Sequence, residues 1–153
     1  MDFGITFKGV VRPERARALV RQAENAGFTY CWFYDSHILW RESFVAIAML
    51  MEHTTKMRFG PCVTNPNTRD WSLAASLFGS LAMQSGGRFE LGVGRGDSAV
   101  RVMGKKPAKL AHLEEFVRDH RPHGPLTADA TEPAWHGYPL TLATPRSGVG
   151  GGG

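Results

Sequence analysis

An acid and an imidazole two residues apart follow a strongly aromatic stretch of the sequence. Asp35 and His37 come directly after residues 28–34, Phe-Thr-Tyr-Cys-Trp-Phe-Tyr. In an extended chain, alternation puts Cys31, Phe33 and Asp35 on one face, and His37 keeps the same parity. Such a pair can share acid–base work or hold a polar ring. A carboxylate that caps a turn, beside a histidine that only forms hydrogen bonds, explains the pattern equally well.

A cluster of amides and hydroxyls occupies residues 63–70, Val-Thr-Asn-Pro-Asn-Thr-Arg-Asp. These groups offer donors and acceptors to a heteroaromatic ligand. Asn-Pro is also a common turn former. The segment is therefore either part of a binding site or an ordinary polar turn after a strand.

The third stretch is residues 91–98, Leu-Gly-Val-Gly-Arg-Gly-Asp-Ser. It is not a phosphate-binding P-loop, because no Gly-Lys-Ser/Thr follows, and Asp97 stands where a dinucleotide fingerprint needs its third glycine. Its Arg-Gly-Asp would be an adhesion signal only on an exposed extracellular loop. What remains is a strand end at which Gly92 and Gly94 admit a close backbone or a planar ligand. Arg95 and Asp97 would stand at the mouth beyond it.

The elements that must position these residues alternate between strand and helix four times. Apolar periodicity predicts strands at 2–8, 28–35, 57–64 and 88–93, about thirty residues apart. The first expected helix begins at Pro13 and stops at Gly27, the second spans about 42–54, and the third follows Asp70 and runs through about 84. A short helix capped by Ser98 and a longer one that carries Leu110 to Val117 come after them. This order predicts an α/β fold with a parallel sheet and right-handed crossovers. In such folds ligands bind at the carboxyl ends of the strands.

Three local signals set the predicted helix limits. Pro13 suits a first helical position, where its missing N–H costs nothing. Asp70 is a good N-cap for the third helix. Gly27 and the pair Gly86-Gly87 supply helix stops.

The composition indicates a globular protein and argues against nucleic-acid-binding and membrane-spanning classes. The chain has 153 residues with 42% hydrophobic and 21% charged residues, as in a globular domain. Its net charge of +4 comes without a dense basic run, so we expect no nucleic-acid partner. No apolar stretch has the length of a membrane span, and the first residues lack a basic region before an apolar run. Cys31 and Cys62 are predicted to be reduced core thiols, and the protein to be cytoplasmic.

Residues 118–153 differ from the rest because they are rich in proline and glycine. That composition predicts an irregular, partly disordered tail. Within it, only residues 135–142 are expected to form a short strand or hairpin. His120, His123 and His136 lie in this segment at spacings that do not predict a metal site.

Together these motifs resemble the luciferase-like monooxygenase family, in its coenzyme F-420-dependent oxidoreductase branch. The resemblance covers roughly residues 1–117, which we take as one domain. It rests on Tyr34-Asp35-Ser36-His37, Cys62-Val63-Thr64-Asn65-Pro66, Ser85-Gly86-Gly87-Arg88 and residues 91–98, with shorter matches at Phe3-Gly4-Ile5 and Ala26-Gly27-Phe28.

The resemblance implies a TIM-type (β/α)8 barrel with the cofactor ring in its carboxyl-terminal mouth. It implies hydride transfer between a reduced deazaflavin, coenzyme F-420, and a small organic substrate. A non-proline cis peptide backing the ring would fall at Cys62–Val63. The implied catalytic residues are Asp35 and His37. The implied cofactor-binding residues are Cys62, Val63, Thr64, Asn65, Gly94, Arg95 and Asp97.

The sequence departs from the family in length, because a full barrel takes about 250 residues. Four βα units predict a half-barrel, a truncated member of the family. Half a barrel exposes strand edges and an apolar face, so the chain either pairs with a second copy as a homodimer or aggregates. Two other functions stay open: a monooxygenase that uses flavin mononucleotide (FMN), and a catalytically silent fragment.

Overall fold

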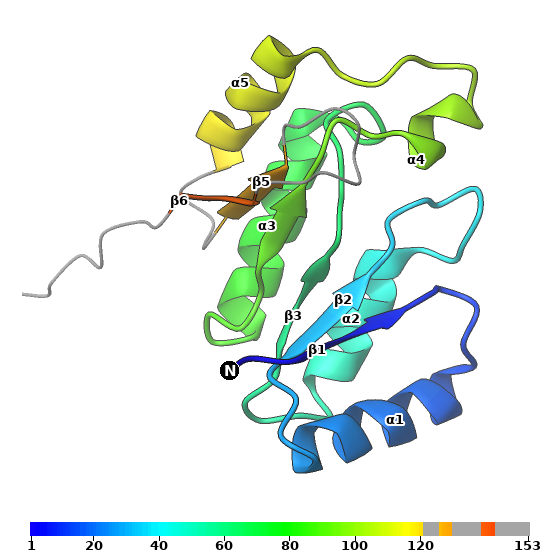
Figure 1. The fold of residues 1–153 in the computed structure, drawn as a ribbon, viewed down its shortest axis with the longest axis vertical. Helices are drawn as coiled ribbons and strands as arrows, with labels where there is room; N and C mark the ends of the chain where they lie inside the picture. Colours follow the sequence, from blue (N-terminus) through cyan, green and yellow to red (C-terminus); the bar gives the residue numbers. More distant parts are fainter. Residues whose placement is uncertain (121–125, 130–138, 143–153) are drawn as a thin grey trace, which may run out of the picture.

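The computed structural model describes residues 1–120, 126–129 and 139–142 of the chain. Strands and helices alternate through its first part (Figure 1). The elements, in chain order, are β1 (Gly4–Phe7), α1 (Pro13–Asn25), β2 (Tyr30–Phe33), α2 (Ser43–Met51), β3 (Arg58–Pro61), α3 (Trp71–Gln84), β4 (Leu91–Val93), α4 (Ser98–Arg101), α5 (Leu110–His120), β5 (Leu126–Asp129) and β6 (Pro139–Leu142).

The first four strands run parallel, as the sequence predicts. β1, β2 and β3 form one sheet in that order, with Phe7 opposite Phe33 and Phe33 opposite Pro61. Parallel bridges from Phe59 to Phe89 and from Thr64 to Val93 connect β3 to the β4 segment. β4 also pairs in parallel with β5, and β5 pairs antiparallel with β6. The structure is thus an α/β fold with its parallel strands in sequence order.

The local helix signals are confirmed. α1 begins at Pro13 and ends two residues before Gly27, whose φ is +88°. The Asp70 side chain accepts a hydrogen bond from the Ser72 N–H at 2.9 Å and caps α3. Gly86 and Gly87, at φ +61° and +81°, follow the end of α3. These left-handed conformations are accessible to glycine without steric cost, so the chain turns sharply there.

A cluster of phenylalanines joins the helices to the sheet. The Phe78 ring of α3 lies 5.5 Å from Phe44 of α2, 5.9 Å from Phe89 and 6.4 Å from Phe116 of α5, between ring centroids. All four side chains are buried. Aromatic pairs at these separations add to the stabilisation that burial gives, so this cluster holds α2, α3 and α5 in one core.

Two predictions about single residues are wrong. Cys62 is exposed rather than a core thiol, because it lies one residue beyond β3, in the loop that begins there. Ser98 is the first residue of α4 rather than its cap, and Asp97 holds the cap position. Cys31 is buried as predicted, and burial raises the pKa of its thiol.

The tail region differs from the expected irregular segment, because β5 and β6 lie within it. β6 falls inside the expected hairpin segment 135–142, whereas no sequence pattern predicts β5. α5 continues past the expected domain limit at residue 117. His123, His136 and residues 135–138 lie outside the described residues.

Two further observations bear on the expected surroundings of the chain. No helix in the described part is long and apolar enough to cross a membrane. Among the described strands, β1 pairs only with β2 and so lies at a sheet edge. Pairing of two copies through such an edge stays a prediction.

The backbones of the β3 and β4 segments approach each other unusually closely. A Cβ atom on Gly60 would lie 2.0 Å from the Glu90 carbonyl oxygen, and one on Gly92 would lie 2.3 Å from the Pro61 carbonyl oxygen. Both obstacles are backbone atoms, which cannot turn aside as a flexible side chain can. The approach of these two segments therefore requires glycine at both positions.

We expect Gly60→Ala to destabilise the fold by about 3 kcal/mol, because the added methyl forces the two backbones apart. Urea denaturation of the purified variant measures this. Gly4→Ala is the matched control, since its nearest obstacle is the Trp32 side chain at 3.1 Å. An equal loss in both variants would contradict the close-approach argument.

The Glu24 carboxylate organises the turn that leads into β3. It accepts backbone hydrogen bonds from Thr55, Lys56 and Met57 at 2.7–3.1 Å. Burial alone would raise the pKa of Glu24, but these three N–H donors and the nearby Arg88 lower it below its ordinary value. A carboxyl whose pKa is lowered by folding stabilises the protein above its ordinary pKa, and that contribution is lost as the pH falls through the folded value.

We expect Glu24→Gln to cost about 1 kcal/mol near neutral pH, with allowance for solvent screening of this half-buried group. The cost should be clearly smaller in acid, once the pH has fallen through the folded pKa of Glu24. Denaturant titrations at the two pH values measure the difference. Glu14→Gln, at an exposed site in α1, is the matched control for the loss of one carboxylate and should cost clearly less near neutral pH. A loss of the same size at both pH values would show that the charge of Glu24 does not matter.

Candidate functional site

The loops that follow β2, β3 and β4 meet at the carboxyl ends of the strands, on the side where α4 lies in Figure 1. The Thr64 N–H donates to the Gly92 carbonyl at 2.9 Å, and the Gly94 N–H donates to the Thr64 carbonyl at 2.8 Å. The hydroxyls of Ser36 and Ser98 lie 3.3 Å apart. We call the region formed by these three loops the mouth. Here the structure brings together the three stretches that the sequence analysis selected.

Asp35 lies at the base of the mouth, where it is 3% exposed. Its Oδ2 accepts from the Thr64 hydroxyl at 2.6 Å and from Arg69 at 2.5 Å. Its Oδ1 accepts from the Ser43 hydroxyl at 3.1 Å and from Arg69 at 3.0 Å. Four donated hydrogen bonds match the capacity of a carboxylate. Asp35 is therefore a fixed anion within the fold, with no vacant acceptor for a ligand.

Arg69 is the functional partner that the sequence analysis does not identify. Its guanidinium bridges Asp35 and both carboxylate oxygens of Glu42, the latter at 2.8 and 2.9 Å, and lies 4.6 Å above the Phe44 ring. Partial burial alone would lower the pKa of Arg69, but the two carboxylates raise it above its ordinary value. The only sequence signal is an arginine in the polar segment after β3, which does not indicate its partners.

The peptide bond between Cys62 and Val63 is cis, at the position that the family resemblance implies. Cys62 and Val63 are exposed, whereas Thr64 and Asn65 are buried. A Cβ atom on Gly94 would lie 2.7 Å from the Val63 side chain, so glycine there lets Val63 rest against the end of β4. The exposed surface of this segment is therefore the Cys62–Val63 unit.

Asn65 is held inside the mouth rather than offered to solvent. Its Oδ1 accepts from the Asn67 N–H at 3.0 Å. Gly96, with φ +78°, lies so close that a Cβ atom there would be 2.8 Å from the amide carbon of Asn65. The buried pair Thr64 and Asn65 thus links the loop after β3 to the loop after β4.

The two predicted rim residues Arg95 and Asp97 have partners within the protein. The Arg95 Nε donates to the Ala108 carbonyl at 2.7 Å, and the Ala108 N–H donates to the Arg95 carbonyl at 2.8 Å. Asp97 forms an exposed ion pair with Arg101. Arg95 therefore anchors residue 108 beside the mouth, while Asp97 stands in solvent.

His37 lies in an exposed turn after β2. The turn is closed by the N–H groups of Leu39 and Trp40, which both donate to the Ser36 carbonyl at 2.8 Å. Within the described part of the chain, the imidazole has no hydrogen-bond partner. Ile38 and Leu39 next to it are 55% and 43% exposed. The rim of the mouth thus combines one uncommitted imidazole with exposed apolar side chains.

A sequence model of luciferase-like monooxygenases matches residues 1–123. The chain belongs to the luciferase-like monooxygenase family. This confirms the resemblance drawn from the three motifs, over most of the described residues. Roles of individual residues are not established by the match, so the site assignments stay predictions.

Relatives of this family member include enzymes that use coenzyme F-420. The chain is 34% identical over 123 residues to a 5,10-methylenetetrahydromethanopterin reductase of Archaeoglobus fulgidus, covering 77% of the chain and 37% of that enzyme. It is 33% identical over 94 residues to an F-420-dependent hydroxymycolic acid dehydrogenase of Mycobacterium tuberculosis, covering 56% of the chain and 26% of that enzyme.

A solved structure gives the same relationship in three dimensions. The coenzyme F-420-dependent tetrahydromethanopterin reductase of Methanopyrus kandleri superposes with a TM-score of 0.68 at 27% identity. The match covers 75% of this chain and 38% of that one. The chain therefore spans less than two-fifths of the length of each of these relatives.

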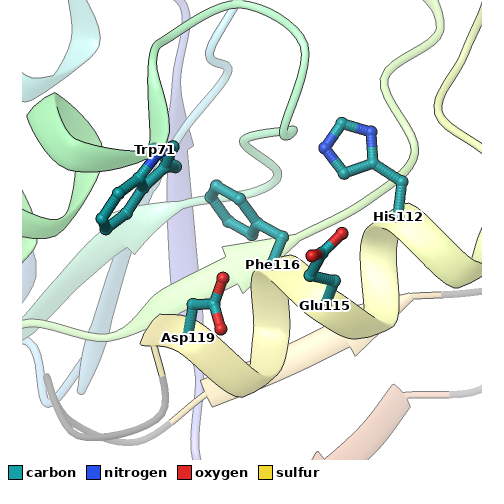
Figure 2. A pocket seen from close by; sticks show the side chains of 5 residues that line it. All are labelled: Trp71, His112, Glu115, Phe116 and Asp119. Carbon is teal, nitrogen blue, oxygen red and sulfur yellow. The ribbon is translucent and has the colours of Figure 1, made fainter.

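A cleft of about 410 Å³ lies between the start of α3 and one face of α5 (Figure 2). Trp71 of α3 and Phe116, His112, Glu115 and Asp119 of α5 line it. None of the predicted site residues lines this cleft, so it is separate from the mouth. The described residues contain no cluster of His, Cys, Asp and Glu that could hold a metal ion.

We expect Arg69→Met to destabilise the protein by about 3–5 kcal/mol, because it leaves the buried Asp35 carboxylate without its cation. Thermal and urea denaturation measure the loss. Arg58→Met is the matched control, since Arg58 pairs with the partly buried Glu90 at 2.8 Å far from the mouth. The Arg58 side chain is 39% exposed, so we expect Arg58→Met to lower the free energy of unfolding by about 1 kcal/mol or less. Equal losses would contradict a special role for Asp35.

Proposed function

We propose that the mouth binds the deazaflavin ring of coenzyme F-420 and that the protein is an oxidoreductase transferring hydride to or from an organic substrate. The observation that carries the proposal is the meeting of the mouth loops at the carboxyl ends of the strands, where Val63 exposes apolar surface beside the buried and bonded Thr64 and Asn65. F-420-dependent relatives support the choice of cofactor. We further propose that the four βα units correspond to one half of a (β/α)8 barrel.

The residues present suit a planar aromatic ring. Val63, Ile38 and Leu39 expose apolar surface on two of the three mouth loops, and apolar walls with a few polar groups are typical of cofactor sites. His37, Arg95 and Asp97 supply polar groups at the rim. Thr64 and Asn65 would support the ring-binding surface from inside the protein, because both side chains are buried and hydrogen-bonded there.

The two proposed catalytic residues would then have different roles. A bound deazaflavin supplies hydride chemistry, for which the protein must supply orientation and protons. His37 is the candidate proton donor or acceptor, because its imidazole is exposed and has no partner in the described part of the chain. Asp35, with four bonded donors, would hold the mouth in shape rather than exchange protons with a ligand.

The proposed substrate is a small organic molecule. The relatives named above act on a pterin derivative in one case and on a hydroxymycolic acid in the other, by their names. Specificity on such scaffolds resides in loops, and the chain spans only part of the length of these relatives.

The proposal is tested by titrating the purified chain with coenzyme F-420 and, separately, with FMN, following quenching of cofactor fluorescence. We expect saturable binding of both or of F-420 alone, with F-420 bound at least about tenfold more tightly. Val63→Asp should weaken F-420 binding by about tenfold or more, because it places a charge on the apolar contact surface.

Val45→Asp is the matched control, since Val45 is 62% exposed on α2 and lies outside the mouth loops. It should leave the affinity unchanged. Tighter binding of FMN would instead support the FMN-dependent monooxygenase. Failure of both cofactors to bind saturably would leave the chain as a catalytically silent member of the family, and an equal loss in both aspartate variants would place the site elsewhere.

A further inference from the structure

One guanidinium connects three segments around the mouth. Arg69 follows β3, Asp35 follows β2, and Glu42 is the residue directly before α2, where its carboxylate also accepts from the Phe44 N–H at 3.2 Å. Arg69 reaches all four carboxylate oxygens of Asp35 and Glu42 within 3.0 Å. Nη1 and Nη2 bind Asp35 as a bidentate pair, and Nη2 also reaches both Glu42 oxygens. A planar guanidinium suits this arrangement, whereas a lysine ammonium offers its three donors from a single nitrogen.

The Asp35 carboxylate also contacts the segment proposed to form the cofactor surface. Asp35 accepts the Thr64 hydroxyl at 2.6 Å, and Thr64 is 1% exposed. The Thr64 backbone is bonded on both sides to β4 and its loop, through Gly92 and Gly94. Val63, whose side chain is exposed, is the residue directly before Thr64. A change in how Asp35 is held is therefore transmitted to the Val63–Asn65 segment through one hydrogen bond.

We infer that Arg69 is a positioning residue: acting through Asp35 and Thr64, it fixes the Val63–Asn65 segment against which the cofactor ring would lie. This inference rests on the proposed function only in taking the bound group to be a deazaflavin ring. Arg69 neutralises a carboxylate that would otherwise be buried and unpaired, so Asp35 can bind the Thr64 hydroxyl without drawing in water. The arginine itself needs no contact with the ligand.

The decisive measurement is amide hydrogen exchange at Thr64 and Gly94, because their N–H groups form the bonds that hold this segment. Rates are compared with that of Phe59, whose N–H bonds to the Arg88 carbonyl at 2.9 Å at the other end of β3. The ratio removes any general change in stability. Arg69→Met should raise both ratios by about tenfold, and Arg58→Met should leave them unchanged.

A second variant separates the role of the charge from that of packing against Phe44. In Arg69→Met combined with Asp35→Asn, no buried charge is left unpaired, and the amide oxygen can still accept the Thr64 hydroxyl. We expect its exchange ratios to return to within about threefold of the original chain. Arg69→Lys keeps the positive charge but loses the planar guanidinium, so its exchange ratios should lie between those of the original chain and those of Arg69→Met. It replaces Arg69→Met in the experiment if that variant does not fold.

Unchanged ratios in both Arg69→Met and Arg69→Lys would overturn the inference. So would a double variant that exchanges as fast as Arg69→Met alone, because Arg69 would then act through its own packing. Titration with coenzyme F-420 adds an independent readout, in which Arg69→Met should weaken binding about tenfold and Arg58→Met should not. Undiminished affinity in Arg69→Met would show that the segment is not the cofactor surface. No binding by the unaltered chain would refute the proposed function alone, since the exchange ratios need no cofactor.

Discussion

The arrangement of the mouth depends on one buried ion pair. Asp35 sits where β2 ends, and its burial would be costly if Arg69 did not reach it from the loop after β3. Because the same arginine also binds Glu42 in front of α2, the pair fixes where the second helix begins relative to two strand ends. An ion pair of this kind adds little net stability compared with apolar packing. Its effect is to allow one arrangement of three loops and to penalise others.

The close approach of the β3 and β4 segments is the second constraint, and it acts on the backbone. Gly60 and Gly92 each face a carbonyl oxygen at a distance that excludes any side chain. The two parallel bridges between these segments leave Thr64 bonded between Gly92 and Gly94. The ion pair thus holds Thr64 from one side by its hydroxyl, and the glycines let β4 hold it from the other by its backbone.

Much of this fold follows from local sequence signals because each acts within a few residues. Pro13 and Gly86-Gly87 set helix limits through their own backbone conformations, and Asp70 does so through a hydrogen bond from Ser72. The thirty-residue spacing of apolar stretches predicts parallel strands. The three loops of the mouth follow from the rule that parallel strands end on the same side.

Contacts between distant residues could not be predicted in the same way. Nothing near Arg69 in the sequence indicates that it pairs with Asp35, 34 residues earlier. Cys62 was expected in the core because its neighbours are apolar, but its exposure depends on where β3 ends. β5 was not anticipated because four residues in a polar, proline-rich region carry too little periodicity, and only the pairing with β4 defines them as a strand.

The polar groups of the mouth divide into those buried at its base and those at its rim, where Arg95 and Asp97 have partners within the protein. Asp35, Thr64 and Asn65 are buried, and their hydrogen bonds hold the loops of the mouth together. His37 stands in an exposed turn, and Val63 with its exposed neighbours supplies apolar surface. The proposed ring site would benefit from this division, because the bonded residues keep the apolar surface in place while the exposed imidazole stays available to a ligand. The pairing of Arg69 with Asp35 supports this division, since it gives the buried carboxylate a cation and completes its four donated hydrogen bonds.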